Sequence, residues 1–168
     1  RRHTRYISVT GVQTCALPIY GRQFFSPEVD YVGLDYDAEI IEVASEQKWG
    51  NSQFMTADIN EVPDAYLSQF DTIVLFEIVE HVKNGKEIVQ RLLKLCKRLL
   101  ISVPYDEPVG FWGHHHVLHG LTEKDFPNAE YAFINQHGVL SSHPENITLE
   151  NRDRKSTRLN SSHTDISR

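Results

Sequence analysis

The chain has 168 residues, of which 40% are hydrophobic and 10% aromatic, and its formal net charge is −6 at pH 7. This length suits one domain and this composition excludes a disordered chain, while the acidic balance argues against a nucleic-acid partner. Apolar runs such as Ile73–Phe76 are too short for a membrane span. Two cysteines exclude a disulfide scaffold and favour a reducing compartment, so we expect a cytoplasmic protein.

The charge is unevenly distributed along the chain. Residues 20–151 contain 9 basic and 21 acidic residues, whereas residues 1–19 and 152–168 are both basic. All eight Phe and both Trp lie within 20–151. This division predicts one acidic, core-forming domain between two polar ends.

Both ends resemble translated sequencing-adapter DNA, through the strings SVTGVQTCALPI and DRKSTRLNSSHTDISR. We therefore expect residues 1–19 and 152–168 to be non-native tails that pack little, and 20–151 to be the domain. A signal peptide does not fit the N-terminus, because polar residues interrupt the apolar ones that follow the arginines. Cys96 lies among leucines, which predicts a small buried residue.

The middle of the chain alternates between predicted strands and helices. Apolar and β-branched runs predict strands at 31–35, 53–57, 70–76 and 98–103, with weaker strands at 131–135 and 146–149. Apolar residues at helical spacing predict helices at 38–48 and 86–97, with a short one near 65–68. This alternation is typical of an α/β fold with a doubly wound, mostly parallel sheet.

Acidic residues follow three of the predicted strands, at the edge where such sheets bind ligands. Asp35 suits the two hydroxyls of a ribose, or alternatively a helix cap. The Asp58 carboxylate could accept a hydrogen bond from an exocyclic amine, with Ile59 packed against a flat ring. Alternatively, Asp58 forms an Asx turn. Glu80 and His81 are expected as a charged pair at the lip of the site, or alternatively as the first turn of a helix.

These segments together resemble the class I S-adenosylmethionine-dependent methyltransferases. The quoted strings are YVGLDYD, FMTADINEVP, FDTIVLFEIVEHVKN and LLISVPY, in the family's order, and the E-x-x-E-H of the third is the most specific. The resemblance implies a Rossmann-like fold and S-adenosylmethionine as the cofactor. It assigns cofactor binding to Gly21, Gly33, Asp35, Tyr36, Asp58, Ile59, Phe76 and Glu77.

The sequence departs from the family at its start. The family's first strand and glycine-rich loop are expected before residue 20, where the adapter-like string lies. The departure predicts an N-terminally truncated fragment in which Gly21 is the last remnant of the loop. A missing central strand would expose sheet edges on both sides of the gap.

Methyl transfer from a sulfonium requires alignment of donor and acceptor and, for a hydroxyl or amine acceptor, a base. Histidine suits that role near neutral pH. We expect the acceptor between the Glu80–His81 turn and the loop 111–119, with His81, His115, His116 and His119 as candidate catalytic residues. Transfer by alignment alone is the alternative. A small molecule, a lipid or a glycan remains open as the acceptor.

The histidine cluster is also a candidate metal site, because Asp106, Glu107, Glu123 and Asp125 could add oxygen ligands. His115 and His119 are four residues apart and His116 and His119 three apart, which suits two ligands on one helix. Gly113 and Gly120 bracket the cluster and weaken a helix there, so we expect no metal. Two other functions stay open: a nucleotide (NAD-type) oxidoreductase or epimerase, and a degenerate, non-catalytic domain.

Overall fold

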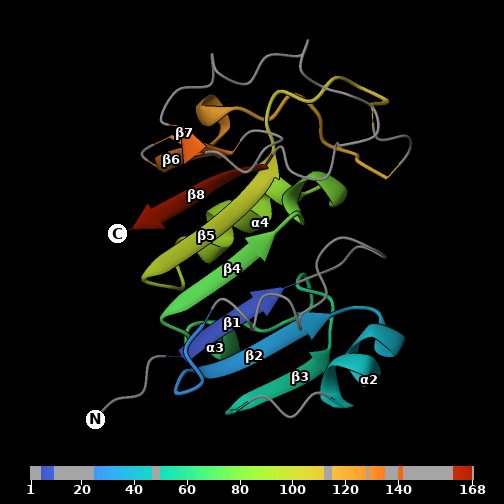
Figure 1. The fold of residues 1–168 in the computed structure, drawn as a ribbon, viewed down its shortest axis with the longest axis vertical. Helices are drawn as coiled ribbons and strands as arrows, with labels where there is room; N and C mark the ends of the chain where they lie inside the picture. The colour runs from blue at the N-terminus through green and yellow to red at the C-terminus, as the bar shows by residue number, and fades with distance from the viewer. Residues whose placement is uncertain are drawn as a thin grey trace.

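A computed structural model describes residues 5–9, 25–46, 50–111, 115–127, 129–134, 140–141 and 161–167. Its strands form one sheet in the order β3-β2-β1-β4-β5-β8-β6-β7 (Figure 1). The strands are β1 (Arg5–Val9), β2 (Asp30–Asp35), β3 (Ser52–Thr56), β4 (Thr72–Phe76), β5 (Arg98–Pro104), β6 (Glu130–Ile134), β7 (Leu140–Ser141) and β8 (Ser161–Ser167). The α-helices are α2 (Ala38–Glu46), α3 (Asp64–Leu67) and α4 (Gly85–Leu92), and two short 3₁₀ helices span Val79–His81 and Glu123–Asp125.

The first five strands of the sheet are parallel, which confirms the predicted α/β fold. One face carries alternate strand residues such as Leu34, Leu75 and Ile101, which pack with Leu67 of α3 and Leu92 of α4 in one core. Figure 1 shows α4 behind β4 and β5, and α2 toward the viewer beside β3. Helices on both faces bury the sheet, so its strands are rich in apolar residues.

The N-terminal end does not behave as the loosely packed tail that we expected. β1 pairs in parallel with both β2 and β4, with Ile7 opposite Val32 and Ile73. Ile7 is 0% exposed. The expectation of a missing central strand and exposed edges is therefore wrong for Arg5–Val9. Alternation of Ile7 and Val9 toward the core supplies the pattern that a buried strand requires, even in a short segment.

The C-terminal end also contributes to the sheet. β8 pairs antiparallel with β5 over Arg98–Pro104 and, on its other side, with β6. The expectation that residues 152–168 pack little is wrong for Ser161–Ser167. The edge of a parallel sheet has unpaired backbone groups, so an added strand satisfies them whatever its own side chains are. The strand predicted at 146–149 lies outside the described residues.

The predicted helix 86–97 ends early, at Leu92. The chain then turns, because it must enter β5 beside β4. The backbone amides of Lys97 and Arg98 both donate to the carbonyl of Asp71, the residue before β4. Leu93, Leu95 and Cys96 continue the apolar pattern through this turn and pack against the core, which explains why their spacing resembled a longer helix. Cys96 is buried, as predicted.

Gly85 begins α4 where the helix touches the turn after β4. A Cβ at this position would lie 2.2 Å from the carbonyl oxygen of Val79. We expect Gly85→Ala to lower the free energy of unfolding by about 1–3 kcal/mol, since either the helix or the turn must shift. Urea unfolding measures this loss. Gln90→Ala, on the exposed side of the same helix, is the control and should change stability by less than about 0.5 kcal/mol. Equal stability of the two variants would contradict the close approach.

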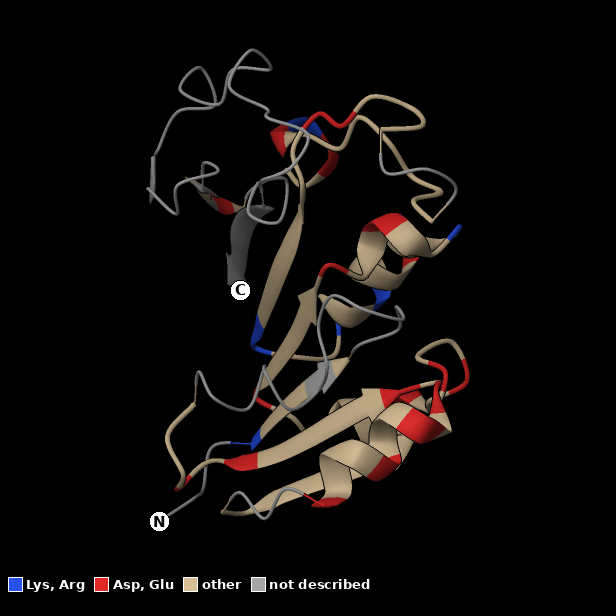
Figure 2. Cartoon of the chain, turned by 45° about the vertical axis from the view of Figure 1, so that its right-hand side comes forward, with Lys and Arg blue, Asp and Glu red and all other residues tan. Residues whose placement is uncertain are grey.

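No helix among the described residues has the length and apolar character needed to cross a membrane. Figure 2 shows Asp and Glu concentrated on α2 and on the loops that follow β2 and β3, with Lys and Arg scattered. Other acidic residues lie on α4 and around the 3₁₀ helix Glu123–Asp125, so only part of the acidic charge expected from the sequence lies at the ends of β2 and β3.

Candidate functional site

The carboxyl ends of β2, β3 and β4 lie along one edge of the sheet. In spatial order the strands are β3, β2, β1 and β4, all parallel. Asp35 ends β2, Asp58 follows β3 by two residues, and Glu77 follows β4 directly. Asp35, Asp58 and Glu77, all expected to bind the cofactor, therefore belong to one edge, where open α/β sheets bind ligands.

Asp35 is fixed at this edge. Its side chain is buried, with 1% of the residue exposed, and Oδ1 accepts a 2.8 Å hydrogen bond from the amide of Asp37. Tyr36, next to it, is 55% exposed and turned to solvent. Gly33 lies inside β2, paired with Ser8 and Phe54, two residues before the edge. Gly21 lies outside the described residues.

The loop after β3 is an Asx turn. Oδ1 of the exposed Asp58 accepts from the backbone amide of Asn60 at 2.8 Å and from its side-chain amide at 3.0 Å. Ile59 is buried beneath the loop. The alternative reading of Asp58 as a turn residue is therefore present in the structure, and the turn still holds this carboxylate at the edge.

Arg91 of α4 holds the loop after β3 in place through hydrogen bonds. Its Nε donates to Oδ1 of Asp64 at 2.7 Å, and its Nη1 donates to the carbonyl oxygen of Ile59 at 2.9 Å. A third bond joins Nη2 to the carbonyl oxygen of Val62 at 2.5 Å. One guanidinium thus orders the segment that carries Asp58 and Ile59.

Arg91→Ala is expected to lower the free energy of unfolding by about 1.5–3 kcal/mol, because three acceptors lose a charged donor. Chemical denaturation checks the value, and Lys94→Ala, an exposed cation one turn further along the chain, is the matched control. If both variants lose the same small amount, Arg91 does not anchor the loop.

Glu77 has a strained backbone at the end of β4. Its φ is +54°, a region that non-glycine residues rarely adopt. Ser102 of β5 holds it there, because the Glu77 amide donates to the Ser102 carbonyl at 3.0 Å and to its hydroxyl at 3.1 Å. Such strain persists where the surroundings determine it and is concentrated at functional sites. Phe76, the last residue of β4, is half-buried.

The turn after β4 and the loop after β5 are joined directly. The Glu80 carbonyl accepts from the amides of Val117 and Leu118 at 2.8 and 2.9 Å. The Glu80 side chain points inward and is 1% exposed, and that of His81 is 8% exposed. The expectation of a charged pair on the lip of the site is wrong, because the loop covers both side chains. The two segments predicted to flank the acceptor are in contact.

Buried ionisable groups gather at this junction. Burial raises the pKa of Glu80 well above its ordinary value, and the nearby carboxyl of Glu77 acts in the same direction. Burial likewise raises the pKa of Glu77, against the effect of Ser102. For His81, burial lowers the pKa to about 4, with the hydrogen bond to His115 opposing the shift. The His81 imidazole is therefore neutral at pH 7 and keeps a lone pair on one ring nitrogen.

The four candidate histidines have different surroundings. Nδ1 of His81 lies 2.9 Å from the carbonyl oxygen of His115, whose own side chain is exposed. Nδ1 of His116 lies 2.5 Å from Oε2 of Glu107. His119 is half-buried, and its Nδ1 is buried with no hydrogen-bond partner among the described residues. The structure thus unites His81 with His116, whose rings are 4.5 Å apart, while His115 contributes a carbonyl.

Ser102 is a site residue that was not expected from the sequence, and Glu107 was expected only as an oxygen donor for a metal at the histidine cluster. Glu107 is 4% exposed and pairs with His116, while Ser102 orients Glu77. Neither belongs to a motif with characteristic spacing. Ser102 could have been found from its place in the strand that neighbours Glu77. That place is known only once the register of β4 and β5 is known.

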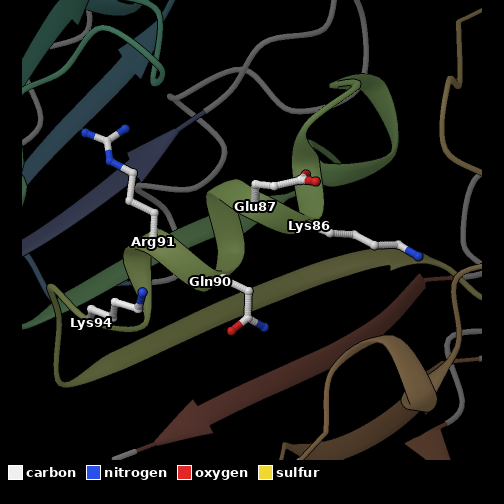
Figure 3. A pocket seen from close by; sticks show the side chains of 5 residues that line it. All are labelled: Lys86, Glu87, Gln90, Arg91 and Lys94. Atoms are coloured by element: carbon white, nitrogen blue, oxygen red, sulfur yellow. The ribbon is translucent and has the colours of Figure 1, made fainter.

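A surface pocket of about 330 Å³ lies elsewhere, along the outer face of α4. Figure 3 shows the five side chains that line it pointing in different directions, with Arg91 and Lys86 extended toward opposite ends of the helix. Arg91 is engaged with the loop after β3, and Lys86 pairs with Asp125. The pocket therefore lacks the convergent polar groups of a binding site.

Comparison with protein families gives one relevant match. A family model described as "Methyltransferase domain" matches residues 19–152, a range that begins after β1 and ends before β8. A comparison with curated proteins gives no match.

Solved structures share the fold at low sequence identity. WbdD, in complex with a kinase inhibitor, is similar with a TM-score of 0.64 and 18% identity over 99% of this chain and 36% of that one. The plantazolicin methyltransferase BpumL, in complex with SAH, gives 0.61 and 14% over 100% and 77%. The N-terminal domain of EvdMO1, with SAH bound, gives 0.53 and 16% over 98% and 74%. This chain spans about a third of the length of WbdD.

Proposed function

The chain belongs to the methyltransferase-domain family, and from this premise we propose that it transfers the methyl group of S-adenosylmethionine to a small-molecule, lipid or glycan acceptor. The observation that carries the proposal is the row of strand-end acids at one edge of the sheet, with Asp35 buried and fixed between Asp58 and Glu77. BpumL and the EvdMO1 domain, which have the same fold, bind SAH, the demethylated form of this cofactor.

The residues at the edge fit such a cofactor. Asp35 offers carboxylate oxygens for ribose hydroxyls, and the Asx turn presents Asp58 with Ile59 on the neighbouring strand end. Glu77 lies across β1 from them, and its Oε1 is buried without a hydrogen-bond partner among the described residues. A buried polar atom of this kind is costly unless a ligand satisfies it. When bound, the cofactor supplies an activated methyl group on a sulfonium.

The chain's own residues then have to position the acceptor and keep water away. The loop after β5 is hydrogen-bonded to the turn after β4, which closes this end of the site. Phe111 and Val117 of the loop are exposed apolar side chains, suited to contact an acceptor of mixed polarity. Trp112 and His114 lie outside the described residues. The acidic edge disfavours a nucleic-acid acceptor, because it repels phosphates.

Asp35→Ala is expected to weaken S-adenosylmethionine binding by roughly 10- to 150-fold, the equivalent of about 1.5–3 kcal/mol for a charged hydrogen-bond partner. Isothermal titration calorimetry on the chain measures this change. The matched control is Asp30→Ala, an acid at the opposite end of the same strand, which should leave the affinity unchanged. Because Asp35 also accepts from Asp37, circular dichroism of each variant checks the fold. An unaltered dissociation constant in a folded Asp35→Ala variant would remove Asp35 from the site.

A further inference from the structure

We infer that the junction between the turn after β4 and the loop after β5 binds a divalent transition-metal cation through Glu80, His81 and His116. One ligand atom from each of these residues lies within 4.8 Å of the other two. From the sequence we expected no metal. The candidate ligands there were histidines of the 115–119 cluster and acids near it, whereas this set combines His116 with Glu80 and His81, which precede it by 36 and 35 residues.

The Glu80 carboxylate carries the inference. It is 0% exposed, and in the part of the chain that the structure describes no side chain except the neighbouring carboxyl of Glu77 offers its oxygens a hydrogen bond. Its Oε1 faces Nε2 of His81 at 3.8 Å, beyond hydrogen-bond distance. Two ligands of a single transition-metal ion, each bound at about 2.0–2.2 Å, are separated by roughly 3–4 Å. A cation between these atoms would satisfy both.

Nδ1 of each histidine has a partner of the kind that metal-binding histidines have. Nδ1 of His81 donates to the His115 carbonyl, which leaves the lone pair of the ring on Nε2, the atom that faces Glu80. Nδ1 of His116 is paired with Glu107, so Nε2 is the ring nitrogen that would bind the cation. Metal-binding histidines commonly donate their second nitrogen to a carbonyl or a carboxylate, which fixes the ring. Here the partner of His81 is a carbonyl and that of His116 is a carboxylate.

The ligand set also indicates the kind of ion. Two imidazoles with one carboxylate suit Zn²⁺ and related transition metals, whereas Mg²⁺ and Ca²⁺ prefer oxygen. Binding of this cation requires no cofactor, so it goes beyond the proposed methyl transfer and can be tested independently of it.

The test is a titration of the full chain, stripped with a chelator, with Zn²⁺ and Mn²⁺ in separate arms and Mg²⁺ as the comparison, followed by calorimetry. We expect saturable binding of one Zn²⁺ or Mn²⁺ per chain and much weaker binding of Mg²⁺. Glu80→Gln and His116→Gln should each weaken binding by more than about 100-fold, and Glu107→Gln, which acts through His116, by about 10- to 100-fold.

Glu87→Gln, an exposed acid on α4, is the matched control and should bind as the unmodified chain does. His116→Gln changes a loop residue, so it remains informative if the buried Glu80→Gln variant fails to fold. Absence of saturable Zn²⁺ and Mn²⁺ binding by the unmodified chain would overturn the inference. So would full affinity in a folded His116→Gln or Glu80→Gln variant.

Discussion

Ile7→Asp is expected to unfold the whole domain. Ile7 is 0% exposed and lies between β2 and β4, opposite Val32 and Ile73. The substitution places an unpaired charge in the core, at a cost of about 3–5 kcal/mol, and removes a buried side chain worth about 2–5 kcal/mol. Together these losses approach the 5–15 kcal/mol that stabilises a typical domain.

Far-UV circular dichroism and urea unfolding measure the effect. Ile7→Val is the graded control, since it keeps an apolar branched side chain and should cost only about 0.5–1.5 kcal/mol. A folded Ile7→Asp variant with the stability of the unmodified chain would show that Arg5–Val9 is not the central strand. It would also restore the original expectation of a loosely packed N-terminal end.

His119→Ala is expected to lower kcat for methyl transfer by about 10²- to 10⁴-fold while leaving the affinity for S-adenosylmethionine unchanged, as loss of a general base does. This prediction rests on the proposed function and on the inferred cation site. The inferred cation occupies the lone pairs of His81 and His116, which leaves His115 and His119 as bases. His119 is preferred because its Nδ1 is buried and has no hydrogen-bond partner among the described residues, whereas the His115 side chain is exposed.

The assay follows labelled methyl groups from S-adenosylmethionine into small-molecule, lipid and glycan fractions, and then measures initial rates with the accepting fraction. Lys124→Ala, an exposed residue five positions further along the chain, is the control and should keep full turnover. Full turnover by His119→Ala would mean that this histidine is structural. If His115→Ala also kept full turnover, methyl transfer would proceed by alignment of donor and acceptor alone.

The parallel part of the fold was predictable because its signals are local. The apolar run of β4 and the acid that ends β2 appear in the sequence as patterns within a few residues. The central position of β1 was not predictable in the same way. Arg5–Val9 is five residues long and is preceded and followed by polar residues, so only its pairing with two strands distant in the chain shows that it is buried.

The site was predictable only in part, for a similar reason. Strand-end acids can be located from the strands alone, since parallel strands share one edge. The burial of Glu80 depends on the loop that covers it, and the link between His116 and Glu107 depends on how that loop folds back. No spacing rule relates His81 to His116, so their proximity required the structure.

The central claim, that this edge of the sheet binds S-adenosylmethionine, is tested most directly by titrating the chain with S-adenosylmethionine and, separately, with NAD. We predict saturable binding of one S-adenosylmethionine per chain, lost or strongly weakened in Asp35→Ala, and no binding of NAD. Binding of NAD in preference to S-adenosylmethionine would favour an oxidoreductase or epimerase. Binding of neither by the folded chain would contradict the account and favour a non-catalytic domain.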